Sequence, residues 1–126
     1  MTTVLVVDDD PDIRELIAFK LRALGFTIEA AGDGEAALAA ALAAPPDLIL
    51  LDVMMPKMSG HDVTKQLRAN VSTEVTPIIL LTAKAQESDV AYGFSLGATD
   101  YIIKPFSPRD LINRVQAVLE RAPSAL

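Results

Sequence analysis

The sequence predicts an α/β fold in which a parallel sheet of five strands carries helices on both faces. Five short apolar runs alternate along the chain with five stretches of helical period. The runs are apolar at nearly every position, as in strands that are buried on both faces, and their connections are long enough for helical crossovers. With 126 residues, of which 51% are hydrophobic, the chain can bury one core and fold as one domain.

The first half of the chain is predicted to contain three strands and two helices. Each strand is an apolar run that ends at polar or small residues, and each helix is a periodic stretch with recognisable ends. Asp10 and Pro11 begin the first helix and Gly25 ends it, whereas Pro45 stops the Ala-rich second helix. The predicted elements are, in order, the strand 4–7, the helix 11–24, the strand 26–31, the helix 35–44 and the strand 48–51.

The second half is predicted to contain three helices and two strands. Ser59 and Asp62 have the spacing of a capping box, Gly97 ends the fourth helix, and Ser107 precedes Pro108 at the start of the last one. We expect one domain over residues 1–122 and a short tail over 123–126. The predicted elements are a helix after residue 59 that includes Val63 and Leu67, the strand 77–81, a helix over about 86–96, the strand 101–103 and the helix 108–119.

Charge and composition exclude several classes of function. The 17 acidic and 11 basic residues give a net charge of -6, which repels nucleic-acid phosphates, so we expect no direct binding to nucleic acid. The lack of cysteine excludes disulfides and thiolate metal sites. No apolar run reaches the roughly 18 residues of a membrane span, and the first residues do not resemble a signal peptide. We therefore expect a soluble, cytoplasmic protein without membrane contact.

Polar side chains follow four of the five predicted strands. Asp8, Asp9 and Asp10 come after the first strand, and the later positions are Asp52, Thr82 and Lys104. If strands one, three, four and five are neighbours, these groups meet at the carboxyl edge of the sheet. Carboxylates about 4 Å apart repel by roughly 4 kcal/mol per pair at an effective dielectric near 20, so the cluster calls for a cation. Oxygen ligands without His or Cys favour Mg2+.

A carboxylate, a hard cation, a lysine and a hydroxyl together suit phosphoryl transfer. Asp52 can attack phosphorus as a nucleophile, because the cation and Lys104 would neutralise charge on the phosphoryl oxygens while Thr82 donates a hydrogen bond. The product would be an aspartyl phosphate.

The chain resembles the receiver domain of bacterial two-component response regulators over essentially its whole length. The resemblance implies a flavodoxin-like (βα)5 fold with a doubly wound sheet of strand order 2-1-3-4-5. It also implies that a sensor histidine kinase or a phosphotransfer protein supplies the phosphoryl group. The segments that carry it are Val4–Asp10, Leu50–Pro56, Leu81–Ala83 and Lys104–Phe106.

The same resemblance implies a role for each site residue. Asp52 is the phospho-acceptor, and Asp8 and Asp9 form the acidic pair that binds Mg2+, for which Mn2+ can substitute. Asp52 and the backbone carbonyl of Met54 complete the metal ligands. The phosphate-binding and switch residues are Thr82, Ala83, Lys104 and Tyr101, and the Lys104–Pro105 peptide bond is cis.

The output of such a module is binding rather than catalysis, so we expect no enzyme beyond assistance to its own phosphorylation and dephosphorylation. The surface of the fourth helix, fifth strand and fifth helix would control a downstream protein partner or a missing effector domain. We expect a monomer or a phosphorylation-dependent dimer. DNA-binding members that dimerise often carry two acidic residues before the switch tyrosine, whereas this chain has Thr99 and Asp100, which argues against that dimer.

Three alternatives compete with this interpretation. A calcium-binding loop is disfavoured because Ile13 and Phe19 stand where its Gly and bidentate Glu belong. A magnesium-dependent phosphatase of the haloacid dehalogenase type and an unphosphorylated receiver-like binding scaffold stay open. His61, the only histidine, has no companion ligands and is expected to be solvated, and the methionines at 54, 55 and 58 are expected to be packing residues.

Overall fold

A computed structural model describes residues 2–83 and 87–121 of the chain. Its sheet has five strands in the order β2-β1-β3-β4-β5, and all neighbouring strands are parallel. The predicted fold class and strand order are therefore confirmed. The strands are β1 (Thr3–Val7), β2 (Thr27–Ala31), β3 (Leu48–Asp52), β4 (Ile78–Thr82) and β5 (Asp100–Ile103).

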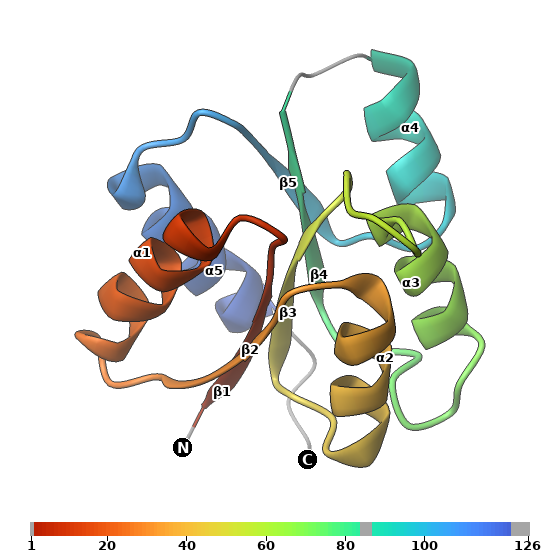
Figure 1. Cartoon of the computed structure of the whole chain (residues 1–126), viewed down its shortest axis with the longest axis horizontal. Helices are drawn as coiled ribbons and strands as arrows, with labels where there is room; N and C mark the ends of the chain where they lie inside the picture. Colours follow the sequence, from red (N-terminus) through yellow and green to blue (C-terminus); the bar gives the residue numbers. More distant parts are fainter. Residues whose placement is uncertain (1, 84–86, 122–126) are drawn as a thin grey trace.

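Five helices connect and cover the strands. Figure 1 shows α1 and α5 on one face of the sheet and α2, α3 and α4 on the other. The predicted start of the fourth helix near Gln86 and the predicted tail lie outside the described residues. No helix in the described ranges is long and apolar enough to cross a membrane. The helices are α1 (Pro11–Arg22), α2 (Gly34–Ala43), α3 (Gly60–Arg68), α4 (Glu87–Ser95) and α5 (Pro108–Arg121).

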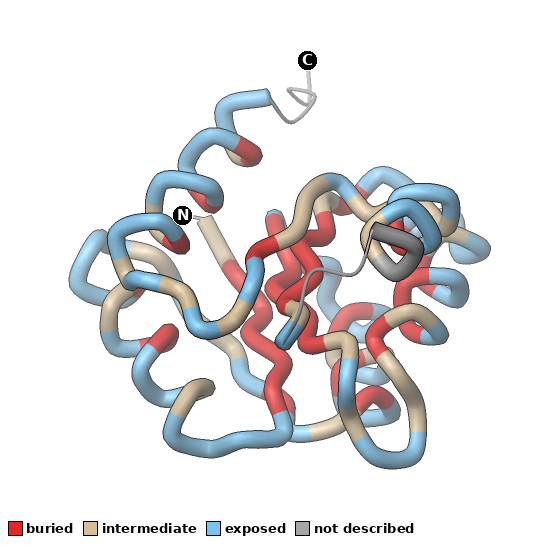
Figure 2. Tube along the Cα trace, turned by 90° about the horizontal axis from the view of Figure 1, so that it is seen from above, coloured by how far each residue is buried: buried red, intermediate tan, exposed pale blue. Residues whose placement is uncertain are grey.

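The core has two layers, one on each face of the sheet. Val4 and Val6 of β1 pack with the layer under α1 and α5, whereas Leu5 and Val7 pack with the layer under α2 and α3. Because successive side chains of a strand point to opposite faces, a strand covered on both sides must be apolar at every position. Figure 2 shows the resulting column of buried strands inside a more exposed shell of helices. The continuous apolar runs of the sequence follow from this arrangement.

Local side-chain hydrogen bonds fix where the helices begin. The Asp10 carboxylate accepts from the backbone N–H of Asp12 at 2.9 Å and caps α1, with Pro11 at the first helical position. Ser59 caps α3 by accepting from the Asp62 N–H at 3.1 Å. These caps satisfy backbone donors that have no partner within the helix. The helix starts predicted from capping residues are thus confirmed.

The end of α1 differs from the prediction by one short turn. The helix ends at Arg22, and the next residues form a tighter turn in which Leu24 N–H donates to Leu21 at 3.0 Å and Gly25 N–H to Arg22 at 2.9 Å. Gly25 has a φ of 94°, in the left-handed region that glycine occupies without strain. Leu24 was predicted as helical because its spacing fits the apolar face, but the chain leaves the α-helix two residues before Leu24, in the turn that leads to Gly25.

Candidate functional site

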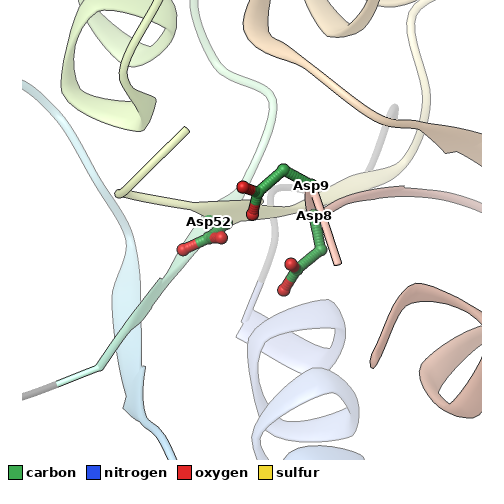
Figure 3. Close-up of side chains that lie close together, drawn as sticks. All are labelled: Asp8, Asp9 and Asp52. Atoms are coloured by element: carbon green, nitrogen blue, oxygen red, sulfur yellow. The ribbon is translucent and has the colours of Figure 1, made fainter. Parts of the chain in front are cut away.

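Three carboxylates meet at the carboxyl edge of the sheet. One oxygen each from Asp8, Asp9 and Asp52 lies within 4.8 Å of the others, and Figure 3 shows these side chains gathered at the ends of β1 and β3. The two strands are neighbours, with Val7 in register with Leu51, so residues that follow them are brought side by side. Asp10 instead caps α1 and is not part of the cluster.

Lys104 reaches the same cluster from the end of β5. Its Nζ lies 2.8 Å from Asp8 Oδ2 and 3.4 Å from Asp52 Oδ2. Asp8 is fully buried and Asp52 is 4% exposed, whereas Asp9 is exposed at the rim. One ammonium group against three carboxylates leaves an excess of negative charge in a poorly solvated place. This set of oxygen donors fits a hard divalent cation.

Burial and charge change the acidity of the central groups. Burial, and next the negative charge of Asp8, raise the pKa of Asp52 to about 6, although Lys104 and the Met54 N–H act in the opposite direction. Burial alone would lower the pKa of Lys104, but its hydrogen bond to Asp8 and the two carboxylate charges outweigh this effect, so that pKa is raised. Without a cation, the ionised form of Asp52 is therefore less stable in the folded protein than it would be in water. The charged form of Lys104 is instead stabilised.

Met54 contributes its backbone to the site. Its N–H donates to Asp52 Oδ1 at 3.2 Å and orients the carboxylate. The Met54 side chain is 72% exposed, so the expectation that it is a packing residue is wrong, whereas Met55 and Met58 do pack against the α2–α3 core layer. Val53, the first residue after β3, still packs on that layer, whereas the side chain of the next residue, Met54, lies outside the core. Its carbonyl as a metal ligand stays a prediction.

The remaining predicted phosphate-binding residues line the same edge. Thr82 is half-buried at the end of β4, and Ala83 follows it on the surface. The Lys104 N–H donates to the Thr82 carbonyl at 2.6 Å, which joins the ends of β4 and β5. The Lys104–Pro105 peptide bond is cis, the conformation that the resemblance implies.

Tyr101 lies on β5 between α4 and α5, away from the carboxylates. Its half-buried ring meets Phe94 edge to face, with 5.8 Å between centroids, and the Arg114 guanidinium lies 5.9 Å from its centroid. Arg114 also bonds Asp100 at 3.0 Å. Thr82 of β4 and Tyr101 both line a cavity of only about 10 Å³.

Two residues near the site were not anticipated from the sequence. His61 is half-buried rather than solvated, because its ring packs edge to face on Tyr92 of α4 with centroids 5.0 Å apart. Arg14 of α1 donates from Nη1 to the Asp8 carbonyl oxygen at 2.8 Å. The helical period shows only that Arg14 is near the polar side of α1. Both contacts depend on how helices dock, which no local motif reveals.

The fold and the site together define a class of protein: a doubly wound α/β protein with an acidic cation site and a lysine at the carboxyl edge of its sheet. Residues 4–116 match the model of the response regulator receiver domain. The chain belongs to this family. It is a phosphoryl-accepting signalling domain of the two-component type, and nothing in the fold or the comparisons favours the phosphatase or the unphosphorylated scaffold.

Curated relatives are similar along nearly the whole chain. The sensory transduction protein RegX3 of Mycolicibacterium smegmatis is 48% identical over 121 residues, which are 96% of this chain and 52% of RegX3. The DNA-binding response regulator MtrA of the same species is 48% identical over 118 residues, 94% of this chain and 50% of MtrA. The chain thus spans about half the length of these relatives.

Solved structures show the same fold. The chemotaxis protein CheY4 of Vibrio cholerae superposes with a TM-score of 0.90 at 38% identity, covering 94% of this chain and 98% of that one. The receiver domain of the sensor histidine kinase PA1611 of Pseudomonas aeruginosa, solved with a magnesium ion in its active-site cleft, gives a TM-score of 0.87 at 32% identity. It covers 94% of this chain and 98% of that one.

Proposed function

We propose that Asp52 is the phospho-acceptor of this receiver domain, and that a sensor histidine kinase or a phosphotransfer protein is the donor. The observation that carries the proposal is the position of the Asp52 carboxylate, buried between Lys104 at 3.4 Å and the acidic pair Asp8 and Asp9. A buried carboxylate with a matched lysine and a place for a cation is suited to attack on phosphorus.

The cation would be held by Asp8, Asp9, Asp52 and the Met54 carbonyl. Mg2+ suits these oxygen donors, and Mn2+ can substitute because carboxylate and carbonyl ligands suit it as well. When bound, Mg2+ supplies positive charge against the phosphoryl oxygens. The magnesium ion in the related PA1611 receiver domain supports this assignment.

The transfer itself uses the protein's own groups. An oxygen of ionised Asp52 forms the bond to phosphorus while the bond between phosphorus and the donor atom breaks, and the donor leaves with the bonding electrons. Lys104 neutralises charge on the phosphoryl oxygens, and the Thr82 hydroxyl and the Ala83 N–H donate hydrogen bonds to them. Hydrolysis of the resulting acyl phosphate, assisted by the same groups, returns the domain to its resting state.

The output would pass through the surface of α4, β5 and α5. Phosphate binding by Thr82 and Lys104 is coupled there to Tyr101, and the surface controls a downstream protein partner or an effector domain, in a monomer or a phosphorylation-dependent dimer. The greater length of RegX3 and MtrA, and the DNA-binding character of MtrA, support an effector as one output. We place this signalling in the cytoplasm.

Acetyl phosphate labelling tests the acceptor. With Mg2+ present, intact-mass measurement should show one phosphoryl addition on the parent chain and none on Asp52→Asn. Asp62→Asn removes an exposed carboxylate on α3 and should be labelled like the parent. Chelation of the metal should abolish labelling of the parent. Equal labelling of the parent and Asp52→Asn would refute the assignment.

A further inference from the structure

Arg14 reaches from α1 to the backbone of the acidic loop. Its half-buried guanidinium donates to the Asp8 carbonyl oxygen at 2.8 Å, and it lies beside Gly32, where a Cβ would stand 3.2 Å from Nη1. In the described part of the chain, no carboxylate lies within 4.0 Å of this guanidinium, although three carboxylates meet nearby. Arg14 therefore binds the main chain of the loop and not its charges.

We propose that Arg14 is a positioning residue for the cation site, in that it fixes the peptide unit between Asp8 and Asp9. The inference rests on the proposed function. The oxygen that Arg14 binds belongs to this peptide unit, so holding it fixes the plane from which the Asp9 backbone departs. The Asp8 side chain is oriented separately, by Lys104 at 2.8 Å and by the Asp10 N–H at 2.9 Å.

Asp9 is the carboxylate that needs such support. It is exposed, and its side chain forms no hydrogen bond or ion pair with the described residues, so its direction is set by the main chain. Like charges within 4.8 Å repel, and an unsupported loop would relax by turning Asp9 away from Asp8 and Asp52. A bond to a carbonyl oxygen prevents that movement without occupying any oxygen that a cation would use.

Because Arg14 is positively charged, the direction of the change in Mg2+ affinity on its replacement tests the proposal. A guanidinium near a divalent cation repels it, so removing the charge alone would tighten Mg2+ binding. Removing the hydrogen bond from Arg14 to the Asp8 carbonyl oxygen would instead weaken Mg2+ binding. Outer-shell partners of metal ligands change affinity by roughly 10–100-fold; because Arg14 acts through the backbone and its charge opposes the cation, we expect about the lower end of that range.

The experiment compares Mg2+ affinity across matched variants of the full chain. Arg14→Met keeps the aliphatic stem and loses the donors, and calorimetric or NMR titration at fixed ionic strength should show Mg2+ binding weakened about tenfold. Arg22→Met makes the same charge change in the exposed last turn of α1 and should leave affinity unchanged. Unchanged or tighter binding by Arg14→Met would overturn the proposal.

A second variant and a second readout separate positioning from general damage. Arg14→Lys keeps the charge, but its side chain ends one bond short of the arginine donor. It should also weaken Mg2+ binding, while its thermal unfolding without metal stays near that of the parent.

With acetyl phosphate, Arg14→Met should reach the parent rate of labelling at saturating Mg2+, with the half-saturating Mg2+ concentration raised by the same factor as Kd. A low rate at saturation with unchanged half-saturation would place Arg14 at the acceptor and refute positioning. Failure of the parent to be labelled would instead refute the proposed function, because the binding comparison does not depend on labelling.

Discussion

At the scale of single residues, the buried position of Asp52 changes the acidity of its carboxyl group. Its pKa rises from 3.8 to about 6 because burial and the Asp8 carboxylate disfavour the ionised form. A carboxyl group whose pKa is raised on folding stabilises the fold most when protonated. Its contribution is fully present below the unfolded pKa and is lost as pH rises through about 6. In the absence of a cation, this shift lowers the free energy of unfolding at neutral pH by about 3 kcal/mol relative to a carboxyl group with an unshifted pKa.

We therefore predict that Asp52→Asn stabilises the metal-free protein more at pH 8 than at pH 4.5. The amide is uncharged at both values, so it removes the destabilisation that ionised Asp52 causes in the folded protein. Because pH 4.5 is already above the unfolded pKa, part of this effect is present there, and the difference between the two pH values should be about 2 kcal/mol. Urea unfolding with a chelator present measures it. The control variant Asp62→Asn replaces an exposed carboxylate, and its effect on stability should show no comparable dependence on pH. An identical effect of Asp52→Asn at both pH values would contradict the prediction.

At the scale of elements, the turn from β1 into α1 divides three consecutive carboxylates between two tasks. Asp8 and Asp9 face the cluster at the sheet edge, whereas Asp10 accepts from the Asp12 N–H and begins the helix. The division follows from geometry, because the chain reverses direction between the end of a strand and the first turn of a helix. One acidic run thus supplies two carboxylates of the candidate cation site and a helix cap.

Alanine substitutions should separate these two tasks. Asp10→Ala should lower the free energy of unfolding by about 1 kcal/mol, the usual effect of losing an N-cap, and leave Mg2+ affinity nearly unchanged. Asp9→Ala should weaken Mg2+ binding without lowering the stability of the metal-free protein, because the side chain is exposed and its charge is repelled by Asp8 and Asp52. Urea unfolding and Mg2+ titration of both variants give the comparison. The reverse order of Mg2+ affinities would mean that the ligand pair is Asp8 and Asp10.

The elements on the other face are joined by Arg68 at the end of α3. Its Nε donates to the Gly97 carbonyl at 2.9 Å and its Nη1 to the Thr73 carbonyl at 3.0 Å, and burial lowers its pKa. A side chain at position 97 would collide with the Arg68 stem, and the φ of 106° there also favours glycine. Arg68 thus ties the C-terminal end of α4 to α3, far from the carboxylates.

At the scale of the whole molecule, Thr82 and Tyr101 connect the carboxylate site with the surface of α4, β5 and α5. Thr82 and Tyr101 line the same cavity, whose volume of about 10 Å³ is near the minimum for one water molecule and far below that of a tyrosine ring. Tyr101 can therefore turn inward only if a neighbour moves. A phosphoryl group that draws Thr82 toward the site would supply that movement.

Thr82→Ala should uncouple phosphorylation from this surface. The variant keeps Asp52 and Lys104 and should still accept phosphate from acetyl phosphate, but it lacks the hydroxyl that a phosphoryl group would attract. NMR shifts with and without beryllofluoride, a phosphate mimic, should extend to α4, β5 and α5 in the parent and shrink there in the variant. The variant should keep the shifts of the β3–α3 loop. The same response in both proteins would refute coupling through Thr82.

Thr99 and Asp100, the two residues before Tyr101, both make contacts between different elements. Thr99, which stands where dimerising relatives often have an acidic residue, uses its hydroxyl to accept from the Ile78 N–H at 3.0 Å and so joins β4 to the start of β5. Asp100 pairs with Arg114 at 3.0 Å within the chain. These contacts engage Thr99 and Asp100 within the chain, and the oligomeric state stays a prediction.

The sequence by itself determined the α/β class, the number of strands and helices, and the residues that follow each strand. These features depend on local periodicity and capping, and parallel strands bring their carboxyl ends to one edge whatever the details of packing. The convergence of Asp8, Asp52 and Lys104 was predictable for that reason. Strand order and the roles within the site came from resemblance to a family, not from the pattern.

Only the tertiary structure decided the contacts that depend on how helices dock. Arg14 on the Asp8 carbonyl, His61 against Tyr92 and the small cavity beside Tyr101 all join residues from different elements. Their spacing along the chain carries no periodic signal, because the angle and depth at which a helix packs on the sheet are set by the sum of many side chains. The raised pKa of Asp52 has the same origin, since burial belongs to the assembled core and not to the residue.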